Sequence, residues 1–84
     1  MNNRPTSSLA IQTKESTAAH LNELEAMLQD TIGLEKSAFR TKMPESMQAE
    51  QNDYLFRIYF LKTKIRDAIS IVETALAVLE AKES

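Results

Sequence analysis

The chain has 84 residues, a formal net charge of −2, a single glycine and no cysteine. This length allows one domain at most, and the lack of cysteine excludes a disulfide framework, a thiolate nucleophile and a thiolate metal site. The slightly acidic balance argues against electrostatic binding to nucleic acid. No apolar segment is long enough to span a bilayer, and the N-terminus has no secretory signal, so a cytoplasmic protein is expected.

The first half of the chain predicts a short polar arm followed by one helix. Residues 1–12 are polar and show no helical period, so we expect a disordered or loosely docked arm. Whether its apolar residues Leu9 and Ile11 cover the second helix stays open. Helix one is expected at about residues 14–41, with an apolar stripe at Leu21, Leu24, Leu28 and Ile32. Gly33 within this helix predicts a weak point or a close helix contact.

The break between the helices is expected at Met43–Pro44, because proline disfavours helical geometry in the preceding residue and suits the first turn of a new helix. Helix two then extends to about residue 82 without a glycine or proline. Its apolar residues alternate in steps of four and three, which is typical of a coiled-coil or bundle seam. The predicted seam consists of Tyr54, Ile58, Leu61, Ile65, Ala68, Val72, Ala75 and Leu79. Three further apolar residues form a shoulder beside it: Leu55, Ile69 and Leu76.

The distribution of charge favours an antiparallel hairpin over one continuous helix. Folding at the break places the basic end of helix one beside the acidic start of helix two. The basic residues are Lys36, Arg40 and Lys42, and the acidic ones are Glu45, Glu50 and Asp53. Further along, Glu23, Glu25 and Asp30 come near Arg57, Lys62, Lys64 and Arg66. The predicted fold is therefore all-α: a coiled-coil-like antiparallel two-helix hairpin, completed by oligomerisation or by a helical partner.

The need for a partner follows from an imbalance between the two helices. In the hairpin, residues 69–79 lie opposite residues 9–19, which are the least apolar part of helix one. Contiguous exposed apolar surface indicates an interaction site, and aromatic residues are frequent binding hot spots. The candidate protein-binding residues are Phe56, Tyr59, Phe60, Ile69, Ile71, Val72, Leu76, Val78 and Leu79.

The sequence offers little for chemistry. His20 is the only histidine and has Glu23 as its only nearby co-ligand, so a surface histidine is favoured over a metal ligand. No nucleophile–base pair at a meaningful spacing indicates catalysis, and no cofactor, metal or small-molecule substrate is expected. Helix two contains a basic run that could contact nucleic acid, but helix one is acidic opposite it, so a paired, solvated face is favoured. The run is Arg57, Lys62, Lys64 and Arg66, with aromatic residues between them.

At this point the chain resembles the small helical-hairpin co-chaperones of bacterial type III secretion. The likeness rests on length, on the helix–break–helix plan, and on residues 48–55 (QAEQNDYL) and 64–72 (KIRDAISIV). It implies a cytoplasmic adaptor that pairs with a second chaperone to keep a needle subunit soluble. Type III needle subunits resemble the chain in size and plan as well.

These patterns predict a non-enzymatic interaction module that presents an apolar helix face to a protein partner, as a small adaptor or co-chaperone. One alternative is a self-assembling filament or needle-type subunit, in which the same surfaces associate without closure. Another is a small phage or plasmid-type regulator, which would bind DNA in a salt-sensitive manner. Neither a membrane span nor binding to nucleic acid is expected under the leading interpretation.

Overall fold

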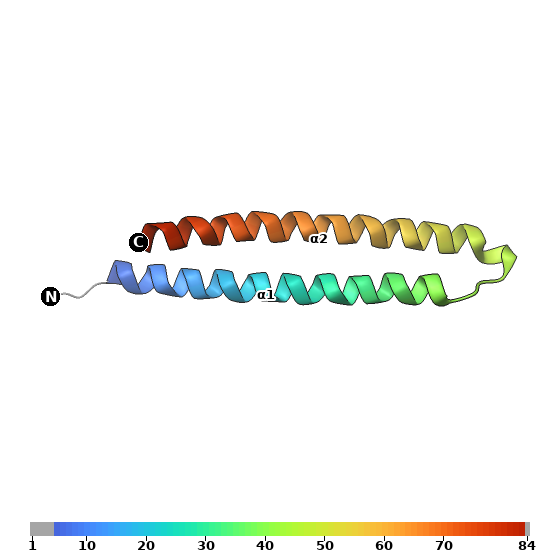
Figure 1. Ribbon diagram of the computed structural model, residues 1–84, viewed down its shortest axis with the longest axis horizontal. Coiled ribbons are helices and arrows are strands. Elements are labelled where there is room, and N and C mark those ends of the chain that lie inside the picture. The colour runs from blue at the N-terminus through green and yellow to red at the C-terminus, as the bar shows by residue number, and fades with distance from the viewer. Residues whose placement is uncertain (1–4, 84) are drawn as a thin grey trace.

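The protein is a long helical hairpin. The computed structural model describes the backbone of residues 5–83 and the side chains of residues 11–81. Two α-helices of 36 residues each, α1 (Pro5–Arg40) and α2 (Gln48–Glu83), lie side by side and antiparallel (Figure 1). A short 3₁₀ helix, η1 (Glu45–Met47), precedes α2. The predicted all-α hairpin is confirmed, and its break falls beside Pro44 as expected.

Helix α1 begins at Pro5, well before the start expected from the sequence. Residues 5–12, which we expected to form a disordered or loosely docked arm, are therefore helical. Proline is well tolerated here because the first turn of a helix needs no amide donor and the ring fixes a helical φ. Residues 1–4 and the side chain of Leu9 lie outside the described part of the chain, and Ile11 is half exposed.

The end of α1 is held to the start of α2 by one glutamine. The Nε2 of Gln51 donates hydrogen bonds to the carbonyl oxygen of Ala38 at 2.9 Å and to that of Thr41 at 3.2 Å. These carbonyls lie at the C-terminal end of α1, where the helix itself provides no donors. Pro44 precedes η1, and its carbonyl accepts a hydrogen bond from the amide of Met47 at 2.8 Å. The connection is thus fixed by hydrogen bonds from both sides of the break.

The face of α2 that packs on α1 is displaced from the predicted seam. The buried and half-buried side chains at three–four spacing are Gln51, Leu55, Ile58, Lys62, Ile65, Ile69, Val72, Leu76 and Leu79. Only half of the predicted seam belongs to this set. Tyr54 and Leu61 are more than two-fifths exposed and Ala75 is exposed as well, whereas the predicted shoulder forms part of the true seam. Helix α1 therefore packs on one side of a broader apolar surface and leaves the other side open.

The seam of α1 has the same periodicity but contains several polar residues. Its buried and half-buried members at this spacing are Lys14, Thr17, Leu21, Leu24, Leu28, Thr31, Glu35 and Ala38. Among the described side chains only Ile58, Ile65 and Thr31 are buried, with 8%, 4% and 3% of their surface exposed. The hydroxyl of Thr31 donates to the carbonyl oxygen of Met27 at 2.8 Å, so this buried polar group is satisfied.

One ion pair connects the two helices inside the seam. The Nζ of Lys62 lies 2.7 Å from Oε1 of Glu35, and both side chains are more than four-fifths shielded from solvent. Lys62 was expected to face Glu23, Glu25 or Asp30, and none of the predicted acid–base pairs forms a salt bridge within the described residues. Two long side chains that reach for each other along the seam are favoured because both would otherwise lose hydration without a partner.

Gly33 lies on the exposed outer face of α1, and no atom comes within 4 Å of the position that a Cβ would take there. The close helix contact expected at this glycine is therefore absent. Replacing Gly33 with alanine should raise the free energy of unfolding by about 1 kcal/mol, because alanine loses less backbone entropy in a helix. Urea unfolding monitored by circular dichroism measures the change, and an unchanged or lower midpoint would contradict it.

The Lys62–Glu35 pair should be costly to break but not essential to stability. Glu35→Leu leaves the Lys62 ammonium group half-buried without its partner, which should lower the free energy of unfolding by about 1–3 kcal/mol. The double variant Glu35→Leu/Lys62→Leu removes both charges from the seam and should unfold at a urea concentration equal to or above that of the unsubstituted chain. A double variant less stable than the single one would show that the charges stabilise the hairpin.

Candidate protein-binding surface

A second stripe of side chains follows α2 beside the seam, and all of them are exposed except Ala68, which is half-buried. Its members recur every seven residues, so they share one face of the helix. They are Met47, Tyr54, Leu61, Ala68 and Ala75. Ile71 and Val78 lie next to this stripe, one step further from α1, and are 70% and 53% exposed. Except for the two alanines, all these side chains are large and apolar.

An equivalent stripe on α1 consists of Thr13, His20, Met27, Leu34 and Thr41, again every seven residues. Two surface hollows show that both stripes lie on the same side of the hairpin. The first is lined by Leu34 of α1 and by Thr41, which directly follows α1. Met47 and Tyr54 line it from the opposite side. The second, at the opposite end of the molecule, is lined by Thr13 and His20 together with Ala75.

We call this side of the hairpin the apolar flank. It is defined by Met27, Leu34, Tyr54, Leu61, Ala68, Ile71, Ala75 and Val78. Among the large members, Met27, Leu34, Tyr54 and Leu61 are each between two-fifths and one-half exposed. The flank follows the length of a molecule that measures 72 × 15 × 14 Å. Contiguous apolar surface of this kind is typical of an interaction site.

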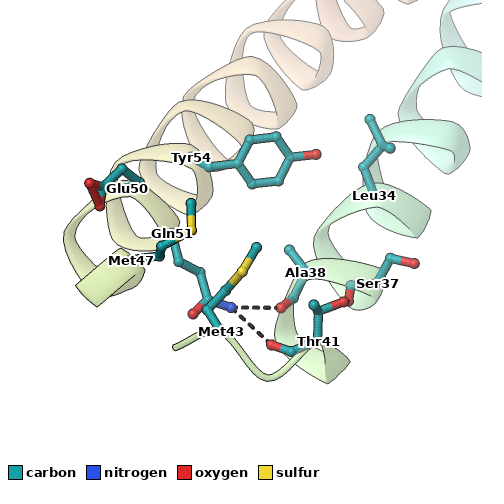
Figure 2. Close-up of a pocket in the computed structure, with 9 residues that line it drawn as sticks. All are labelled: Leu34, Ser37, Ala38, Thr41, Met43, Met47, Glu50, Gln51 and Tyr54. Carbon is teal, nitrogen blue, oxygen red and sulfur yellow. Dashed lines mark hydrogen bonds between the residues drawn. The ribbon is translucent and has the colours of Figure 1, made fainter. Parts of the chain in front are cut away.

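The hollow near the turn, about 380 Å³ in volume, lies between the two helices on the flank. Figure 2 shows the ring of Tyr54 reaching from α2 toward Leu34, with the side chain of Met43 between the helices. The flexible methionines Met43 and Met47 can adapt to different apolar partners. On the α1 side the hollow is lined by two small side chains, Ser37 and Ala38. This arrangement fits an apolar side chain of a partner.

The structure separates the nine predicted protein-binding residues into three groups. The first group is half-buried in the seam with α1, and its members are Ile69, Val72, Leu76 and Leu79. The second group, Ile71 and Val78, belongs to the apolar flank. The third group is exposed elsewhere on α2 and consists of Phe56, Tyr59 and Phe60, which are 68%, 58% and 53% exposed. The predicted binding residues therefore lie in three separate places on α2.

Sequence reasoning missed the α1 half of the flank. The stripe predicted on helix one did not separate Met27 and Leu34 as a second stripe, although their seven-residue spacing runs parallel to the seam. Separating the two stripes requires the neighbour to be known. Once the seam is fixed by burial, the second stripe follows from helical periodicity alone.

The other side of the hairpin is more polar. Its stripes, again at seven-residue spacing, include Glu25 on α1 and Arg66, Glu73 and Glu80 on α2. Phe39 and Tyr59 are the large apolar exceptions, and Phe39 lines a third hollow beside the turn with Asn52. The hairpin therefore has one predominantly apolar side and one mixed side.

The basic residues of α2 do not form a single patch. The Nε of Arg57 donates to Oδ2 of Asp53 at 2.8 Å, one helical turn away. This hydrogen bond, together with the negative charge of Asp53, raises the pKa of Arg57. The ammonium group of Lys64 lies 5.0 Å from the ring centre of Phe60, a cation–π contact. Lys62 is paired with Glu35 within the seam, so the basic residues of α2 have different surroundings.

His20 lies at the mouth of the second hollow, beside Thr17 and Ile71. In the described part of the chain no three histidine, aspartate or glutamate side chains come together as a metal site would require. Nor does any helix over that range have a stretch apolar enough to cross a lipid bilayer.

Comparison with known proteins adds no relative: no family model matches the chain, and neither the curated proteins nor the solved structures include a match.

Proposed function

We propose that this chain is a non-enzymatic protein–protein interaction module, a small adaptor or co-chaperone whose apolar flank packs against helices of another polypeptide. The observation that supports it most is that one hairpin has far more apolar surface than its two helices bury against each other. Only two apolar side chains, Ile58 and Ile65, are buried among those described. Fully burying such a side chain stabilises a fold by about 1.5–3 kcal/mol, so these two contribute only a small part of what is needed to order two long helices.

The shape of the molecule supports the same proposal. Its radius of gyration is 19.5 Å, whereas a compact domain of this length has about 12 Å. Its accessible surface is 6434 Å², whereas a compact monomer of 9.5 kDa exposes about 5,000 Å². The difference is about 1,400 Å², which is the scale of surface that a subunit loses when it enters a stable complex.

We assign no catalytic role, cofactor or metal to the chain, and a cytoplasmic location is part of the proposal. A needle subunit or second chaperone as partner, as the resemblance to type III secretion co-chaperones implies, stays a prediction. A filament-forming subunit is the alternative that the test below separates from an adaptor.

The proposal predicts that the isolated single chain is not a well-packed protein. Circular dichroism and hydrophobic-dye fluorescence of the full chain should be measured from nanomolar to high micromolar concentration. We expect low helicity and dye binding wherever the chain is a lone monomer, because the apolar flank is then uncovered. A monomer that unfolds cooperatively at the lowest concentration and binds no dye would contradict the proposed function. Unlimited growth with concentration would favour the filament-forming alternative.

A matched pair of variants assigns the effect to the apolar flank. Ile71 on the flank and Phe56 off it have nearly equal exposure, 70% and 68%, on the same helix. Ile71→Asp should reduce dye binding and abolish any association, because a buried carboxylate in an apolar contact is strongly disfavoured. Phe56→Asp serves as the control and should leave association unchanged. Equal effects of the two substitutions would place the interaction surface elsewhere.

A further inference from the structure

Along the middle of the apolar flank the charged residues of the two helices carry opposite charge, whereas nearer the turn α2 carries the acidic Glu50. On α1, Glu23 and Asp30 occupy the positions between successive members of the stripe. On α2, Arg57 and Lys64 occupy the equivalent positions. Glu23 and Asp30 form no ion pair or hydrogen bond with any other described residue. In this middle part the flank thus has an acidic edge along α1 and a basic edge along α2.

The levels of these charges along the hairpin match. Leu34 and Tyr54 line the same hollow, as do Thr13 and Ala75 at the other end. Since the two helices rise equally per residue in opposite directions, seven residues back along α1 correspond to seven forward along α2. Between the two ends, therefore, each of the two acidic residues on the α1 side of the flank has a basic residue of α2 at its own level. The pairs at equal level are Glu23 with Lys64 and Asp30 with Arg57.

From this pattern we infer that the partner on the apolar flank is a second copy of this chain, docked face to face about a two-fold axis parallel to the hairpin. This inference rests on the proposed function and names its partner. A rotation about such an axis keeps every level and exchanges the helices, so α1 of one copy packs on α2 of the other. Each Glu23 then faces Lys64 of the second copy, and each Asp30 faces Arg57. The product is a closed four-helix bundle in which every neighbouring pair of helices is antiparallel.

The apolar contacts of this arrangement are complementary in size. Met27 of one copy meets Leu61 of the other, and Leu34 meets Tyr54, so the large side chains fill the half of the interface nearer the turn. At the far end His20 meets Ala68, where a small side chain leaves room for the imidazole ring. In this dimer the second stripe of α2 packs on α1 of the other copy. It forms a seam with the same three–four spacing as the seam within one hairpin.

The other face-to-face arrangement is disfavoured by charge. With the two-fold axis across the hairpin, α1 packs on α1 and α2 on α2. The acidic edges would then meet each other and the basic edges would do the same, which is repulsive at close range. The parallel axis gives four attractive contacts in place of these. Arg57 already donates through Nε to Asp53, and its terminal nitrogens supply further donors for Asp30 of the second copy.

The available area is sufficient for a stable dimer. The surface of 6434 Å² exceeds that of a compact monomer by about 1,400 Å² per chain, and a standard interface buries about 800 Å² per partner. A flank as long as the molecule itself, 72 Å, can supply this area.

The test uses single charge reversals and their mixture. Sedimentation equilibrium of the full chain should give a mass of twice 9.5 kDa. Glu23→Lys and Lys64→Glu each place like charges opposite each other at two symmetric contacts, so each variant alone should dimerise about tenfold more weakly. Mixing the two variants should restore the original affinity, because both contacts of the mixed dimer are again attractive. Rescue by mixing cannot arise from an effect within one chain.

Matched controls and opposing outcomes complete the design. Glu25→Lys and Arg66→Glu make the same changes of charge on the mixed side and should leave the dimer unchanged. Circular dichroism of each variant at high concentration separates loss of folding from loss of association. A chain that stays monomeric but binds dye would overturn the second copy as partner while leaving the proposed function standing. Single reversals without effect would overturn the parallel axis, and growth beyond the dimer would overturn the closed bundle.

Discussion

Each helix of this chain has one neighbouring helix within the molecule, and this constraint determines the rest of the structure. A pair of helices can shield only the stripe of side chains along their line of contact. Even side chains in the middle of that stripe, such as Val72 and Leu76, remain half-buried, since solvent reaches them from both sides. Burial is nearly complete at only three described positions. The hairpin therefore has a line of contact where a globular domain has a core.

The polar residues within the seam give this line its register. Lys62 and Glu35 form an ion pair between the helices, and Gln51 binds the carbonyls at the end of α1. Apolar stripes alone allow two helices to slide by a turn with little penalty, whereas a half-buried charge strongly prefers the one register that provides its partner. The polar residues in the seam thus reduce the apolar area buried there but define the alignment of the helices. Other apolar residues, such as Leu61 and Ile71, lie outside the seam.

The hairpin and its turn were predictable from the sequence, because they depend on local signals: Pro44 and a long three–four period. The predicted acid–base pairs across the break did not contribute, since none of them forms a salt bridge within the described residues. The face of α2 that packs on α1 could not be predicted from the sequence. Two stripes with the same period lie side by side on that helix, one through Leu55 and Leu76 and one through Leu61 and Ile71. Periodicity assigns residues to stripes, but the choice between stripes is made by tertiary packing. The start of α1 was missed for a related reason, since the polar residues after Pro5 show no period of their own.

A helix with two adjacent seams is the geometry of a bundle, where each helix has two neighbours at roughly a right angle around its axis. The seam of α2 is occupied by α1, and the second seam has the same spacing and a comparable number of large side chains. In the middle of the flank the acids Glu23 and Asp30 lie on α1 and the bases Lys64 and Arg57 lie on α2 at equal levels, with Glu50 of α2 nearer the turn. A surface that only contacts solvent does not require acids and bases at matching levels. Such an order favours contact with a surface of opposite pattern, and the same flank rotated by half a turn is such a surface.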